Sequence, residues 1–101
     1  MSGNILLPDG RMWSASSGVY YRVVDHLAAA VTDRELAEQL HAASVHGFRT
    51  FDLGAVTPEQ RQEVLDLVLG PLPPAVAAEF PGPDGAAVRK SVGELRDLAR
   101  G

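Results

Sequence analysis

The fold is decided by residues 32–70, which read TDRELAEQLHAASVHGFRTFDLGAVTPEQRQEVLDLVLG. Thr32 and Glu35 stand at the spacing of a capping box, and Gly47 supplies a stop, so a helix is predicted between them. The run 48–53 then reads as a short strand that a glycine ends.

A second helix follows the predicted strand. Thr57 is a good N-terminal cap, Pro58 suits the first turn, and Gln60 stands at the third position. Gly70 and the proline after it end this helix. The resulting helix–strand–helix unit favours a domain of the α+β class.

The N-terminal part predicts a hairpin and a core helix. The Pro-Asp-Gly sequence at 8–10 is a turn signal between two short segments, 5–7 and 11–13, that read as strands. Segment 19–31 carries an apolar stripe at helical spacing. The stripe consists of Val19, Tyr20, Val23, Val24, Leu27 and Val31.

The composition changes after residue 70. Residues 71–87 are rich in proline, glycine and alanine and read as a connector, within which Pro73 and Pro74 can start a short helix over 75–80. Segment 88–99 then predicts an amphipathic helix. Its stripe is Val88, Val92, Leu95 and Leu98, and it either docks on the core or waits for a partner.

These elements together predict one α+β domain. A small sheet, made of the N-terminal hairpin and the strand near 48–53, packs against about three helices, and a C-terminal amphipathic helix completes the chain. The core covers 1–70, the connector 71–87, and the C-terminal helix 88–101. Strand order stays open, although the two helices between the hairpin and the third strand can supply the crossover that parallel pairing needs.

Composition narrows the classes of protein. The chain of 101 residues contains no cysteine, which removes disulfides, thiol catalysis and cysteine-based zinc sites. The longest apolar run, 27–31, is far shorter than the ~20 residues of a membrane span, and the N-terminus lacks a signal-peptide pattern. Arginine supplies eight of the nine basic residues. We therefore expect a small cytoplasmic protein of bacterial type, with no membrane contact.

Charge is distributed unevenly. The net charge is −4. Residues 32–66 hold seven acids against three bases, whereas residues 88–101 hold four bases against two acids. Binding to a nucleic-acid backbone needs clustered Lys and Arg, so the charge of this acidic body argues against nucleic acid as a partner.

Motifs for catalysis or metal binding are missing from the sequence. His41 and His46 are five residues apart, so they diverge on a helix and do not form an i,i+4 ligand pair. Asp25 and His26 are adjacent on a helix and do not face each other as a dyad. P-loop, nucleophile-elbow and HExxH motifs are absent. We expect no cofactor, no metal and no catalytic residue.

Four polar residues are candidates for contact with an anion or another ligand. Ser16 and Ser17 precede the predicted helix 19–31, where free backbone N–H groups attract anions. His26 flanks the apolar stripe of that helix, and Asp52 stands at the end of the predicted strand. Ordinary helix and turn capping is the simpler interpretation of the two serines and Asp52, and a packed boundary side chain that of His26.

Aromatic residues give the main indication of a binding surface. Trp13, Tyr20 and Tyr21 cluster in sequence, and two adjacent tyrosines cannot both face one core, so at least one lies at its rim. Exposed aromatics are frequent interface anchors. The alternative is a hydrophobic lid over the junction of hairpin and helix. The predicted partner-binding set is Trp13, Tyr20, Tyr21, Val88, Val92, Leu95 and Leu98.

The function predicted from these observations is a small protein-binding module, of the immunity, antitoxin, adaptor or accessory-subunit type. Its partner is another protein or a second copy of the chain. One alternative is a DNA-binding regulator, because segment 24–47 resembles part of a helix-turn-helix. Another is a homo-oligomeric ligand-binding protein or enzyme with its site between subunits. Complete burial of the 88–98 stripe, with no exposed apolar patch elsewhere, would argue against the binding module.

Overall fold

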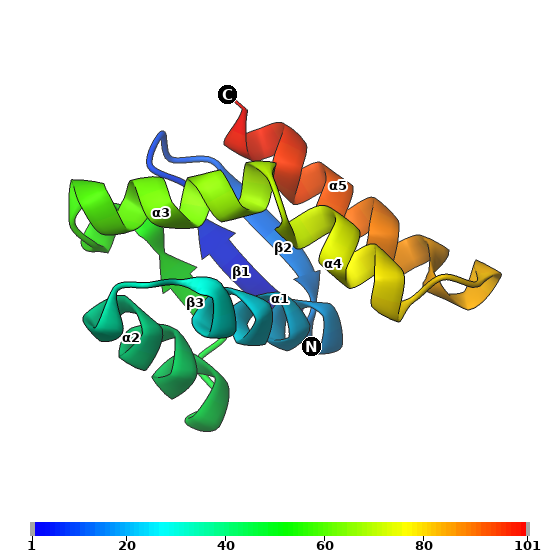
Figure 1. Cartoon of the computed structure of the whole chain (residues 1–101), viewed down its shortest axis with the longest axis horizontal. Coiled ribbons are helices and arrows are strands. Elements are labelled where there is room, and N and C mark those ends of the chain that lie inside the picture. The colour runs from blue at the N-terminus through cyan, green and yellow to red at the C-terminus, as the bar shows by residue number, and fades with distance from the viewer. Residues whose placement is uncertain (1, 101) are drawn as a thin grey trace.

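The computed structural model describes residues 2–100, which form a three-stranded sheet and five α-helices (Figure 1). This arrangement confirms the α+β class. The strands are β1 (Ser2–Leu6), β2 (Met12–Ser16) and β3 (Thr50–Asp52). The helices are α1 (Ser17–Ala30), α2 (Arg34–Val45), α3 (Pro58–Leu69), α4 (Leu72–Glu79) and α5 (Ala86–Ala99), with short 3-10 turns η1 (Leu53–Ala55) and η2 (Pro83–Gly85).

The sheet has the order β2-β1-β3, with β1 in the centre. β1 and β2 form the predicted antiparallel hairpin, in which Ile5 pairs with Trp13. β3 is parallel to β1 and pairs Phe51 with Ile5, so β2, α1 and α2 together provide the crossover. The hairpin turn contains Gly10 at φ +90°, a conformation that suits glycine.

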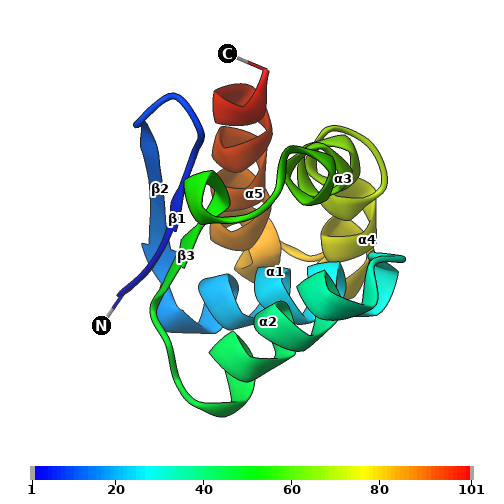
Figure 2. The same ribbon diagram turned by 90° about the vertical axis from the view of Figure 1, so that its left-hand side faces the viewer.

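One face of the sheet packs against the helices and the other faces away from them (Figure 2). Ile5, Trp13 and Phe51 point to the helical side and are buried, following the two-residue period of strands. Gly3 is required in β1 because a Cβ there would lie 2.1 Å from Cγ of Tyr20. This close approach brings α1 directly under the central strand.

The helix starts confirm one predicted cap and correct another. At α3, Thr57 accepts a hydrogen bond from the Gln60 N–H while the Gln60 side chain accepts one from the Thr57 N–H. At α2, the predicted Thr32–Glu35 box is wrong. Asp33 is the cap and accepts from the Leu36 N–H at 2.9 Å, whereas Thr32 bonds to Glu63 of α3.

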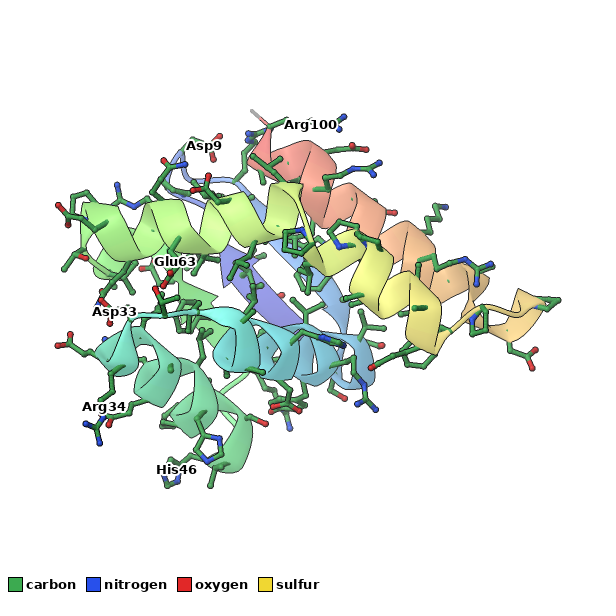
Figure 3. The ribbon with its side chains drawn as sticks, viewed as in Figure 1. Asp9, Asp33, Arg34, His46, Glu63 and Arg100 are labelled. Atoms are coloured by element: carbon green, nitrogen blue, oxygen red, sulfur yellow. The ribbon has the colours of Figure 1, made fainter. Side chains whose placement is uncertain are left out.

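Thr32 instead takes part in a tertiary contact with α3. Its backbone N–H and hydroxyl donate to the Glu63 carboxylate at 3.1 and 2.6 Å, and the Asp33 N–H donates to the same group at 3.2 Å. Figure 3 shows Glu63 directed from α3 toward the loop that holds Asp33. The Glu63 carboxylate therefore ties the α1–α2 loop to α3.

The C-terminal part is more ordered than the predicted connector suggests. α4 begins at Leu72, three residues before the predicted short helix, with its prolines in the first turn, where a missing N–H is tolerated. α5 begins at Ala86 and packs against β2, α3 and α4. Trp13 Nε1 donates to the Ser91 carbonyl of α5 at 2.8 Å. Of the two alternatives for this helix, docking on the core is the one observed.

None of the helices formed by residues 2–100 has both the length and the apolar character needed to cross a membrane.

Candidate functional site

Four of the seven predicted partner-binding residues lie in the core and are not surface anchors. Trp13, Tyr20, Val92 and Leu95 are each at most 2% exposed. Their burial has one cause, which is that α5 and the start of α1 cover the inner face of the hairpin. The lid interpretation of the aromatic cluster therefore describes Trp13 and Tyr20 better than the anchor interpretation.

The remaining three residues of the set are partly buried. Val88 and Leu98 pack against the core from the two ends of α5. Tyr21 lies at the rim, its ring 5.1 Å from that of Tyr20 in an edge-to-face arrangement. The expectation that one tyrosine reaches the rim is thus confirmed, and Tyr21 is that residue.

The four candidate ligand residues lie in three separate places, and Ser16, His26 and Asp52 each have a hydrogen-bond partner there. Ser16 caps α1 by accepting from the Val19 N–H, and Ser17 is the first residue of that helix. His26 Nε2 lies 3.1 Å from both carboxylate oxygens of Glu79 on α4. Asp52 accepts from the Gly54 N–H at 2.8 Å. Capping accounts for Ser16 and Asp52, and an α1–α4 contact accounts for His26.

Exposed apolar side chains gather at the connection between α2 and β3. Val45 is 62% exposed and Phe48 is 57% exposed. The His46 ring lies 5.8 Å from the Phe48 ring, and the Tyr21 hydroxyl lies 3.8 Å from the position of a Cβ on Gly47. We call these residues, Tyr21, Val45, His46 and Phe48, the α2–β3 corner. His46 projects outward from the end of α2 (Figure 3).

The end of α2 has a regular geometry that leads directly into the corner. Gly47 has φ +70°, and the Phe48 N–H donates to the Ala43 carbonyl at 2.9 Å, which is the Schellman pattern of a helix end. An apolar residue after such an end commonly packs back on the helix. Phe48 instead keeps more than half of its surface exposed, so the local turn alone does not account for its ring.

The corner adjoins an open edge of the sheet. β3 has one neighbouring strand, β1, so its opposite edge is unpaired by the sheet. In Figure 2 this edge faces the viewer, and no helix crosses in front of it. Open edges offer backbone N–H and C=O groups to another chain.

Tyr21 is the one residue of the corner that was predicted from sequence, whereas Val45, His46 and Phe48 were not. Val45 lies off the stripe formed by the buried residues Leu36, Leu40 and Ala43 of α2. Phe48 was assigned to the third strand, but β3 begins at Thr50 and leaves Phe48 in the preceding connection. An apolar residue off the stripe beside a glycine stop is the pattern that would have indicated it.

The surface hollows are less suited to binding a small ligand than the α2–β3 corner is to binding a protein. An apolar pocket bordered by His26, Leu67 and Leu72 measures about 60 Å³, whereas ligand sites usually exceed about 300 Å³. A wider groove of about 450 Å³ between α1 and α2 is open, and its Arg34–Glu38 ion pair is strongly exposed. Among residues 2–100, no group of three His, Cys, Asp or Glu side chains could hold a metal ion.

No protein-family model matches this chain, and comparisons with curated proteins and with solved structures found no significant match.

Proposed function

We propose that this chain is a small protein-binding module and that the α2–β3 corner is its contact surface. The supporting observation is the exposure of Val45 and Phe48, at 62% and 57%, at the end of α2 and in the connection that leads to the edge strand β3. Contiguous apolar patches on small proteins frequently mark protein-interaction sites. An aromatic anchor beside polar groups is also the usual composition of an interface hot spot.

The proposal keeps the kind of function predicted from sequence but moves its surface. The stripe of α5 is used within the monomer, and the exposed apolar residues Val45 and Phe48 lie at and just after the end of α2. A strand follows α2, where a helix-turn-helix would place its recognition helix. This order of elements favours protein binding over the DNA-binding alternative.

Photocrosslinking tests this surface directly. A photoreactive phenylalanine analogue at position 48 replaces one aromatic ring with another, so the fold is preserved. The matched control carries the same analogue at Leu69, which is 39% exposed at the end of α3. After irradiation in a lysate of the native cells, we expect defined higher-mass adducts from position 48 and few from position 69.

The proposal would be rejected if position 48 gave no adduct or gave the same diffuse pattern as position 69. A second variant, Phe48→Ser, should remove binding while leaving the circular dichroism spectrum unchanged, because its side chain is mostly in solvent. Mass spectrometry of the adducts identifies the partner, whether another protein or a second copy of this chain.

A further inference from the structure

We infer that the partner of the α2–β3 corner is a second copy of this chain, joined to the first by antiparallel pairing of the two β3 strands. This inference rests on the proposed function and specifies its partner. It comes from the register of β3, which makes the open edge complementary to itself.

The register determines which backbone groups of β3 face outward. Asn4 pairs with Thr50, and the Asn4 N–H donates to the Arg49 carbonyl at 2.6 Å. In a parallel ladder a residue bonds to the two neighbours of its partner, so residues 49 and 51 face β1. The N–H and C=O groups of Thr50 and Asp52 therefore face the open edge.

A two-fold axis at Phe51 satisfies all of these groups at once. Thr50 of one copy then lies opposite Asp52 of the other, and each of the two such pairs exchanges two backbone hydrogen bonds. The two Phe51 residues meet at the axis on the buried side of the sheets. The three-stranded sheets of the two copies thereby become one continuous sheet.

Side chains favour this register over its neighbours. Thr50 and Asp52 are both exposed on the outer face, and in this pairing each threonine hydroxyl faces a carboxylate that can accept from it. A shift that puts Asp52 opposite Asp52 sets like charges together, which is destabilising.

A three-residue strand is a short edge, so backbone pairing alone would be weak. The α2–β3 corner supplies the additional apolar area, since Val45 and Phe48 precede the strand by five and two residues and are exposed in the monomer. This combination of edge and corner explains why Phe48 does not pack back on its own helix.

Opposite charges at position 50 provide the test. Thr50→Asp places a carboxylate opposite Asp52 of the other copy, whereas Thr50→Lys places an ammonium group there. With two such pairs per dimer, we expect the dissociation constant to rise about tenfold for Thr50→Asp and to fall by a similar factor for Thr50→Lys. Sedimentation velocity from low-micromolar to near-millimolar concentration measures both.

Ser14 offers the matched control for the change in net charge. It lies in the same row of the sheet, since Asn4 pairs with both Ser14 and Thr50, but it belongs to β2 at the other edge. Ser14→Asp and Ser14→Lys should leave the dimer nearly unchanged. Equal effects at the two positions would show a general charge effect, and larger effects at Ser14 would place the interface on β2; both results overturn the inference.

A disulfide adds a geometric test, because the natural chain has no cysteine. Opposed residues of a hydrogen-bonded antiparallel pair have Cα atoms about 5.5 Å apart, within the range of a disulfide. A mixture of Thr50→Cys and Asp52→Cys chains should oxidise mainly to the mixed dimer. The inference is overturned if the wild-type protein stays monomeric throughout and the mixture of cysteine variants forms no mixed disulfide. Adducts from position 48 to another protein would then still leave the proposed function standing.

Discussion

Replacing Tyr20 with phenylalanine should stabilise this protein, although it removes a polar group from a well-packed residue. Tyr20 is fully buried, and its hydroxyl has no hydrogen-bond partner. A buried hydroxyl without a partner loses its hydration on folding, at a free-energy cost of about 1–3 kcal/mol. Phenylalanine keeps the ring against Gly3 and removes that cost, so we expect the free energy of unfolding to rise by about 1–2 kcal/mol.

The pH dependence of stability tests the burial of the Tyr20 hydroxyl independently. Burial, with a smaller contribution from Tyr21, raises the pKa of Tyr20 from 10.0 to about 12. The folded state then holds the phenolic proton more tightly than the unfolded state. Stability is therefore fully present below pH 10 and falls as the pH rises toward 12, by at most about 1.4 kcal/mol per pH unit. The stability advantage of Tyr20→Phe should widen over this interval.

Urea unfolding followed by far-UV circular dichroism measures both effects. Tyr21→Phe is the control, because Tyr21 lies at the rim and its loss of a hydroxyl should change stability by less than about 0.5 kcal/mol. If Tyr20→Phe were neutral or destabilising at pH 7, the hydroxyl would have a hydrogen-bond partner in solution, and the reasoning would fail.

Three further substitutions test the fold. Gly3→Ala should lower the free energy of unfolding by about 1–3 kcal/mol or more, because its Cβ would lie 2.1 Å from a ring carbon; an unchanged urea midpoint would contradict this packing. Asp33→Ala should lower the free energy of unfolding by about 1 kcal/mol, because the cap of α2 is lost. Glu35→Ala is the control and should not reproduce this loss. Hydrogen bonds from Thr32 and Asp33 lower the pKa of Glu63 below 4.5, so its stabilising effect is present above that pH and disappears as the pH falls. Thermal melts of Glu63→Gln should therefore differ from wild type at pH 7 and converge in acid.

The local part of the fold could be predicted from sequence because its signals act over a few residues. The turn at 8–10, the cap at Thr57 and the stop at Gly47 each depend on neighbouring residues, and the structure places all three as expected. The prediction of the α2 cap was wrong, although it also rested on neighbouring residues. Thr32 and Asp33 are both good caps, and the bonds from Thr32 to Glu63, 31 residues away, are invisible in the local pattern.

The candidate site depended on tertiary contacts and was therefore predicted poorly. An amphipathic stripe shows that α5 buries one face but not what covers it. The contact between Trp13 and Ser91 joins residues 78 positions apart, and it is this docking that removes Trp13 from the surface. Conversely, phenylalanine is common at buried strand positions, so Phe48 was predicted to lie in the third strand. β3 begins two residues later, and Phe48 is exposed.

The bond between Trp13 and α5 makes this protein its own fluorescent reporter. Trp13 is the single tryptophan of the chain, it is 1% exposed, and its indole N–H donates to the Ser91 carbonyl. Release of α5 would expose that indole to water and shift its emission to longer wavelength, even if the sheet and the other helices stayed folded. Comparing the emission transition with the loss of helical signal would therefore show whether the last helix leaves first or the whole domain unfolds together.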